Sequence, residues 1–139
     1  SGGHALRFYA RIEIWTSVIK RIKHSVNGIE RKIGAVTKVE FKKNHITGWE
    51  GNYVEVPFYR SVGFDDLGGC VDYLTKEGWW KETNKVIIAQ EFDVKLKREA
   101  LVKHIEEKEL QKKLRKLVGQ CWRDVEAQCS VQRKGRYDN

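Results

Sequence analysis

The sequence predicts a mixed α and β protein, an α+β or α/β fragment in which antiparallel strands come first and a small module of a helix, a β-hairpin and two helices follows. Apolar and polar residues alternate with a period of two over much of residues 1–60, which is typical of strands. Beyond residue 95 the apolar residues recur with a helical period. The chain has 139 residues, 40% of them hydrophobic, which is enough for a core and too short for a complete P-loop ATPase.

We expect the chain to be a piece of a longer protein. It contains no Met and opens with Ser1-Gly2-Gly3-His4, which does not fit the native start of an unprocessed gene product. Its expected parts are a sheet-forming part, a compact α/β part and a polar, flexible tail, at residues 1–60, 61–129 and 130–139.

Three strands are expected in the first part. The alternation over residues 5–22 and again over residues 35–43 predicts two strands, and Asn27-Gly28 between them is a typical hairpin turn. These two strands should pair antiparallel. A third extended segment, Tyr53 to Tyr59, carries Pro57, which suits an edge position or a strand end because proline has no N–H for the ladder.

The second part begins with a helix. Asp65-Asp66 can cap its N-terminus, and Gly78 follows where a helix end often requires a positive φ. Its inward face is expected to carry Leu67, Val71 and Leu74. A small hairpin over residues 79–89 should turn at Thr83-Asn84, and two helices should follow at residues 95–107 and 110–128.

The charge balance points to an anionic partner. The chain carries 27 Lys and Arg against 19 Asp and Glu, a net charge of +8, and the excess is concentrated in residues 1–60. No apolar run is long enough for a membrane helix, so we expect no membrane partner.

The cysteines and histidines suggest no special site. The three cysteines show no C-x-x-C spacing, which favours a reducing, cytoplasmic setting over a disulfide framework or a zinc site. The spacing of His24, His45, Cys70 and His104 does not predict metal ligands. We therefore assign no metal site.

The first residues carry a specific resemblance. The stretch Gly2-Gly3-His4-Ala5-Leu6-Arg7-Phe8-Tyr9-Ala10 resembles the Gly-Gly-Asn-Ala-Leu-Lys-Phe-Tyr-Ala segment of the bacterial RecA recombinases. Later segments are similar to markers of the same family in the same order; they are Ile33-Gly34, Thr37 to Val39, Lys42 to Ile46, Gly63-Phe64, Asp66 to Gly68 and Glu77 to Trp79. The resemblance spans about residues 2–118.

The resemblance implies the C-terminal portion of a RecA-like recombinase, bacterial or phage, that acts in homologous recombination and DNA repair. Residues 1–60 would be the last strands of a RecA-type core, and residues 61–129 would be the domain that admits double-stranded DNA. The parent would be a DNA-dependent ATPase that binds ATP and Mg²⁺ and forms filaments in the cytoplasm of a bacterial or phage-infected cell. The phosphate-binding loop would precede Ser1, so this chain alone is not expected to be an enzyme or to hold a cofactor.

The resemblance also implies roles for residues near an intersubunit ATP site. Lys43 and His45 stand where the family has two lysines that reach the γ-phosphate of the neighbour's ATP and stabilise charge in the transition state. His45 departs from the family lysine. Tyr59 or Arg60 would stack on the adenine, at the position where the family has a tyrosine.

The expected DNA-binding residues fall in two groups. The resemblance places Gly2 and Gly3 against the DNA backbone and Arg7 near the contact between neighbouring subunits. In the hairpin region, aromatic rings alternate with cations, a pattern suited to phosphate capture and stacking; these residues are Lys76, Trp79, Trp80, Lys81, Lys85 and Lys95. At least one tryptophan is also expected in the core of the small domain.

Single- and double-stranded DNA and neighbouring RecA-like subunits are therefore the expected partners. One alternative is a stand-alone basic DNA-binding or regulatory domain that never belonged to an ATPase. A second is a small nuclease that uses His24, His45 and Asn44 around a divalent metal.

Overall fold

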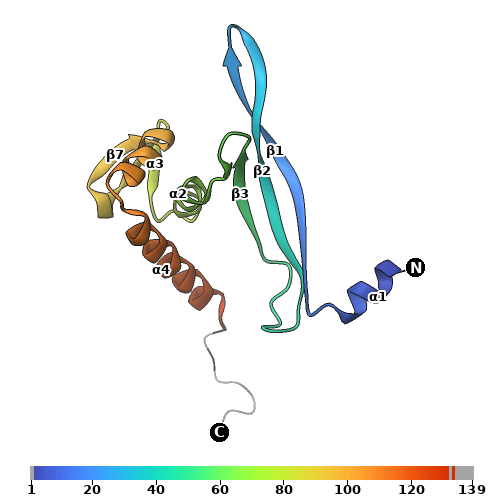
Figure 1. Cartoon of the computed structure of the whole chain (residues 1–139). Coiled ribbons are helices and arrows are strands. Elements are labelled where there is room, and N and C mark those ends of the chain that lie inside the picture. The colour runs from blue at the N-terminus through green and yellow to red at the C-terminus, as the bar shows by residue number, and fades with distance from the viewer. Residues whose placement is uncertain (1, 132, 134–139) are drawn as a thin grey trace. The chain divides into compact units, whose positions relative to one another are not determined.

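The computed structural model describes residues 2–131 and 133 (Figure 1). In these residues the fold is mixed, with four α-helices, one short 3₁₀ helix and two antiparallel sheets. The chain divides into two compact units, of which the first ends at Gly69 and the second begins at Cys70. The division lies inside a helix. Of the expected tail, Ser130, Val131 and Arg133 are described, and the rest lies outside the described residues.

The first unit is one helix and a four-stranded antiparallel sheet in the order β1-β2-β3-β4. Its elements are α1 (Gly2–Tyr9), β1 (Ile12–Val26), β2 (Ile29–Asn44), β3 (Tyr53–Tyr59) and β4 (Gly63–Phe64). The turn predicted between the first two strands is confirmed: Asn27 and Gly28 link β1 to β2 with φ of 55° and 75°, the left-handed geometry of a tight hairpin turn. The predicted third strand is also confirmed.

The prediction of a strand from Ala5 is wrong, because residues 2–9 form α1 and β1 begins at Ile12. The end of α1 is stabilised from a distant part of the chain. The Lys43 Nζ donates to the carbonyl oxygens of Arg7 and Phe8 at 2.7 and 3.3 Å. A cation at a helix C-terminus satisfies carbonyls that have no partner within the helix and complements the helix dipole. Local alternation of residues cannot reveal this contact.

The sheet of the first unit is only partly buried. By register, Ile14, Val18, Val39 and Val54 share one face, and Ile14, Val18 and Val54 are each about 50% exposed. The opposite face carries an ion-pair ladder in which Glu40 contacts Lys38 at 3.0 Å and Lys42 at 3.1 Å. These hydrogen-bonded cations lower the pKa of Glu40 against a smaller opposing effect of burial.

β1 and β2 extend past the rest of the sheet. Gly34 is the last β2 residue that pairs with β3, so the strand pairs from Lys23–Lys32 to the turn stand alone as a two-stranded ribbon. This two-stranded ribbon is the hairpin formed by the blue β1 and the cyan β2 in Figure 1. Ile22 is half-buried, and all side chains from Lys23 to Ile33 are exposed. We call residues 22–33 the ribbon arm.

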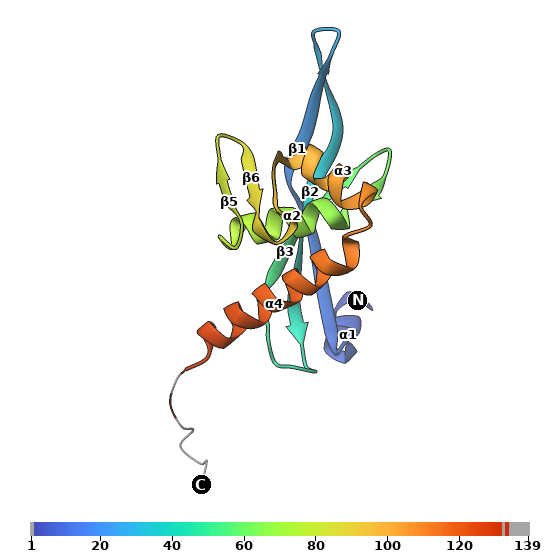
Figure 2. The same cartoon turned by 90° about the vertical axis from the view of Figure 1, so that its left-hand side faces the viewer.

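The second unit contains a three-stranded antiparallel sheet in the order β5-β6-β7 (Figure 2). Its elements are β5 (Lys81–Thr83), β6 (Val86–Ala89), the 3₁₀ helix η1 (Gln90–Phe92), β7 (Val94–Lys97), α3 (Arg98–Glu107) and α4 (Gln111–Cys129). Helix α2 (Asp66–Lys76) crosses the boundary between the units. The predicted cap of α2 is confirmed, since the Asp65 Oδ1 accepts from the Gly68 N–H at 2.8 Å.

The second unit has a closed hydrophobic core. The predicted inward face of α2 is confirmed, because Leu67, Val71 and Leu74 are all buried. Other side chains of the second unit are fully buried as well; these are Trp80, Leu101, Ile105 and Leu114.

Two predictions in the second unit are corrected. Residues 94–97 form a strand, so α3 begins at Arg98 instead of Lys95. Leu96 pairs with Ile87 of β6, and this long-range ladder prevails over the helical period of the sequence. The hairpin turns at Asn84 and Lys85, one residue later than predicted, and both have positive φ.

Candidate nucleic-acid interface

Lysines gather on one face of the sheet in the second unit. The register aligns Lys81, Ile88 and Lys95 across the three strands and Thr83, Val86 and Lys97 in the next row. Because side chains alternate along a strand, these two rows share a face. The opposite face is buried, since it carries Ile87 and Ala89. We call the exposed set Lys81, Lys95 and Lys97 the lysine face.

The charges of the lysine face are close and uncompensated. Lys81 and Lys95 are two strand spacings apart, about 10 Å, and Lys95 and Lys97 are about 7 Å apart along one strand. These separations are close to the Debye length of about 8 Å at physiological salt, so salt screens the three charges only partly from one another and they act together on an anion. All three side chains are exposed, and none forms an ion pair within the described part of the chain.

The structure adds Lys97 to the predicted DNA-binding lysines and places Lys76 away from the lysine face. Lys97 was not predicted, because the helical period of residues 95–107 predicted a helix there. The alternation Val94-Lys95-Leu96-Lys97 is the signal that could have revealed it. Lys85 occupies the turn of the same hairpin and is exposed. Lys76, at the end of α2, lines a hollow beside Glu82 and Ile87, which are on the opposite face of the sheet.

The two predicted tryptophans have different positions. Trp80 is 0% exposed and packs edge-on against Phe92, so it is the expected core tryptophan and has no surface on which a base could stack. Trp79 is half-buried. Both indole N–H groups donate to the Glu91 carboxylate, Trp79 at 2.8 Å and Trp80 at 2.6 Å.

Glu91 is held in its ionised form. Partial burial opposes ionisation, but the hydrogen bonds from Trp80, its own backbone and Trp79, together with the charge of Lys113, outweigh burial and lower the pKa of Glu91. Lys113 also donates to the Glu91 carbonyl and lies over the Phe92 ring. This cluster fixes the segment between the tryptophans and β7.

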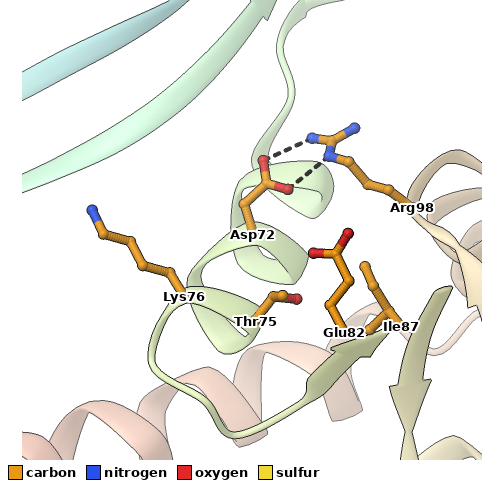
Figure 3. A pocket seen from close by; sticks show the side chains of 6 residues that line it. All are labelled: Asp72, Thr75, Lys76, Glu82, Ile87 and Arg98. Atoms are coloured by element: carbon orange, nitrogen blue, oxygen red, sulfur yellow. Dashed lines mark hydrogen bonds and ion pairs between the residues drawn. The ribbon is translucent and has the colours of Figure 1, made fainter. Parts of the chain in front are cut away.

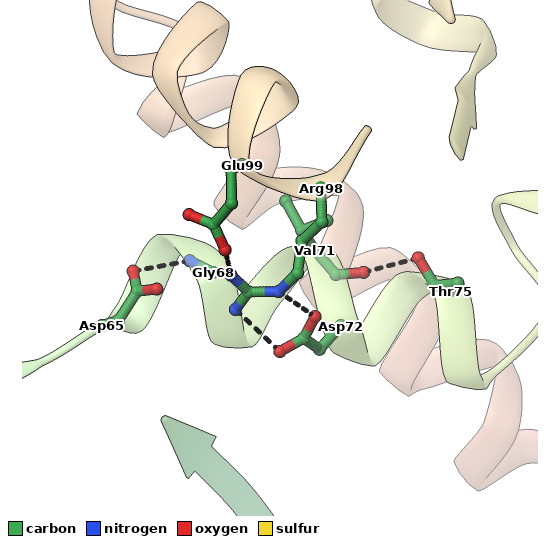
Figure 4. A network of polar contacts seen from close by, with 7 residues as sticks. All are labelled: Asp65, Gly68, Val71, Asp72, Thr75, Arg98 and Glu99. Carbon is green, nitrogen blue, oxygen red and sulfur yellow. Dashed lines mark hydrogen bonds and ion pairs between the residues drawn. The ribbon is translucent and has the colours of Figure 1, made fainter. Parts of the chain in front are cut away.

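A charged hollow lies beside the sheet. It has a volume of 290 Å³ and is lined by Asp72, Thr75, Lys76, Glu82, Ile87 and Arg98 (Figure 3). The Arg98 guanidinium is held by two carboxylates: it makes a two-point contact with Asp72 at 2.7 and 2.9 Å and contacts Glu99 at 2.6 Å (Figure 4). This clamp joins the start of α3 to α2.

The first unit brings together Lys43 and His45, which were predicted at an ATP site, and Arg7, which was predicted near the contact between neighbouring subunits. Arg7, Lys43 and His45 line a hollow of 500 Å³ with His4, Phe8, Glu13, Lys42 and Glu50. Carboxylates offset part of its positive charge. Glu13 contacts Arg7 at 3.2 Å and accepts from the Trp15 indole. That indole bond, followed by the Arg7 and Lys43 charges, lowers the pKa of Glu13 against an opposing effect of burial.

The other predicted residues of the first unit are dispersed. Gly2 and Gly3 belong to the first turn of α1 and are not in a loop. Tyr59 ends β3 and is half-buried, and Arg60 follows in an exposed turn. Neither residue lines either of the two hollows.

Two comparisons with known proteins found no match. No protein-family model matches the chain, and no curated protein matches it. Within residues 2–131 and 133, no three His, Cys, Asp or Glu side chains are grouped so that they could hold a metal ion. No helix in the described part of the chain is long and apolar enough to cross a membrane.

Proposed function

We propose that this chain binds duplex DNA through the lysine face of its second unit. The observation that carries the proposal is the register of β5, β6 and β7, which places Lys81, Lys95 and Lys97 on one exposed face. Lysines that neutralise phosphates release condensed counterions, and this release drives DNA binding. Half-buried Val86 and Ile88 separate the lysines and give the face an apolar floor for sugar contacts.

We further propose that the chain is the C-terminal portion of a RecA-like recombinase. The resemblance over about residues 2–118 supports this assignment. In this proposal the first unit forms the wall of the ATP site between neighbouring subunits, with Lys43 and His45 facing the neighbour's γ-phosphate. That role requires Lys43 to leave the carbonyl oxygens of Arg7 and Phe8.

The DNA proposal is tested by fluorescence anisotropy of a labelled duplex with the intact chain. The test variant is Lys81→Gln/Lys95→Gln/Lys97→Gln, and the matched control is Lys103→Gln/Lys112→Gln/Lys116→Gln, which removes the same charge from α3 and α4. The sheet variant should bind about tenfold more weakly, with a salt slope lower by about 2 to 3, because each lost phosphate contact lowers the slope by about 1. Equal binding by the two variants would contradict the proposal.

A stand-alone basic DNA-binding domain is the second candidate. The bonding of Lys43 to α1 favours it, because Lys43 then has a structural role within its own chain. The two candidates differ in behaviour on long duplexes. A recombinase portion that contacts neighbouring subunits should bind cooperatively, and a stand-alone domain should bind without cooperativity, as sedimentation of chain–DNA mixtures will show.

A further inference from the structure

The ribbon arm of the first unit carries an unusual concentration of positive charge. Its cations are Lys23, Arg31 and Lys32, with Lys20 and Arg21 at its base, and its only carboxylate is Glu30. Glu30 pairs with Lys23 at 2.7 Å. Arg31 and Lys32 form no ion pair within the described residues.

The strand register places like charges in direct opposition. Lys23 lies opposite Lys32 across the ribbon, an arrangement that destabilises an isolated hairpin. One carboxylate cannot neutralise both ammonium groups. A polyanion that binds the ribbon would remove this repulsion, so the arm is better suited to a bound state than to isolation.

Cations occur on both faces of the ribbon. Lys23 and Lys32 share one face, and the next pair along the ribbon, His24 and Arg31, shares the other. A flat anionic surface such as a membrane can contact only one face at a time. A groove with phosphates on both walls can contact both faces at once.

The dimensions of the arm match a DNA groove. From Ile22 to the turn the arm extends roughly 15 Å at 3.3–3.4 Å per residue, whereas the major groove of B-form DNA is about 8.5 Å deep and 12 Å wide and admits a two-stranded ribbon. The deep, narrow major groove of A-form RNA excludes it. The arm can therefore reach the base edges while its cations remain near phosphates.

We infer that the ribbon arm inserts into the major groove of duplex DNA, with Arg31 and Lys32 at phosphates and Val26 and Ile29 at the base edges. Val26 and Ile29 pair directly beside the turn and are 41% and 57% exposed. They present methyl groups that suit the thymine methyl in that groove. This surface is separate from the lysine face and belongs to the other unit.

The test uses the intact chain, a labelled duplex and the variant Arg31→Gln/Lys32→Gln. Its matched control is Lys112→Gln/Lys116→Gln on α4. The arm variant should bind several-fold to tenfold more weakly than the control, with a salt slope lower by about 2. Glutamine also relieves the opposition at Lys23, so the fold should be retained, as circular dichroism will confirm.

A second readout identifies the groove. The wild-type chain should protect guanine N7 from methylation in the major groove, and Val26→Ser/Ile29→Ser should lose this protection with an unchanged salt slope. Protection confined to the minor groove, or an arm variant that binds like its control, would overturn the inference. Equal weakening on single-stranded DNA and duplex would also overturn it, because a single strand has no groove.

The outcomes separate this inference from the proposed function. If the arm variant weakens binding and the lysine-face variant does not, the arm inference stands and the proposed role of the lysine face fails. If only the lysine-face variant weakens binding, the arm inference fails and the proposed function stands.

Discussion

The two units of this chain use similar strands but bury them to very different degrees. In the second unit the β5-β6-β7 sheet has one buried face, at Ile87 and Ala89, and Trp80 fills the core beside it. In the first unit Ile14, Val18 and Val54 on the β1-β2-β3 face are each about 50% exposed. Hydrophobic burial therefore stabilises mainly the second unit, and the first unit presents extended surfaces to its surroundings.

The largest loss of stability is expected from a substitution in the core of the second unit. Trp80→Ala should destabilise that unit by about 3 to 5 kcal/mol, because it leaves a large cavity. Ile14→Ala on the half-exposed sheet of the first unit should cost about 1 kcal/mol or less. Amide hydrogen exchange resolves the two units, and comparable losses of protection in both variants would contradict the comparison.

The second prediction concerns the carboxylate that joins the two tryptophans. Glu91→Ala should cost about 1 to 3 kcal/mol, because the indole N–H of buried Trp80 loses its acceptor. Denaturant unfolding monitored by tryptophan fluorescence measures the loss. Gln111→Ala, at the start of α4, is a control for which a change within about 0.5 kcal/mol is expected.

Glu91 should also make the stability of the second unit depend on pH. The pKa of Glu91 is lower in the folded state, so its ionised form adds stability above the ordinary glutamate pKa of about 4.3. That contribution is lost as the pH falls through the folded-state pKa. The stability difference between wild type and Glu91→Gln should therefore shrink on acidification below about pH 4.3, and a constant difference would contradict the assignment.

The smallest loss of stability is expected from removing the carboxylates that contact Arg98 in the second unit. Asp72→Ala removes the two-point contact with Arg98 and should cost about 1 kcal/mol, a modest value because both side chains are partly exposed to water. The Glu99 side chain, which also contacts Arg98, is 77% exposed. Glu99→Ala should therefore cost less than about 0.5 kcal/mol. The two losses are compared by denaturant unfolding, and a larger loss in Glu99→Ala would show that the clamp is misassigned.

Features that depend on neighbouring residues could be predicted from the sequence. The Asn27-Gly28 turn, the Asp65 cap and the inward face of α2 each follow from local backbone preference or helical period. Helix α1 could not be predicted in this way, because Lys43 stabilises its end from 36 residues away. Strand β7 depends on its pairing with β6, which a helical period at residues 95–107 concealed.

The candidate surfaces were predictable to different extents. Lys81 and Lys95 were identified from the alternation of cations and aromatic rings, but Lys97 required the strand register. Trp80 matched the same pattern and is instead buried, because composition does not show which face of a segment points inward. The opposition of Lys23 and Lys32 could have been counted outward from the Asn27-Gly28 turn, allowing for the register shifts in the strands.

The central claim is that exposed basic strands of this chain contact duplex DNA. Mapping amide chemical shifts by NMR while a short duplex is titrated into the labelled 16.3 kDa chain tests it most directly. The account predicts shifts concentrated at Lys81, Lys95 and Lys97 and at the ribbon arm, with the buried core unchanged. Shifts confined to α4, or none at low salt, would contradict it.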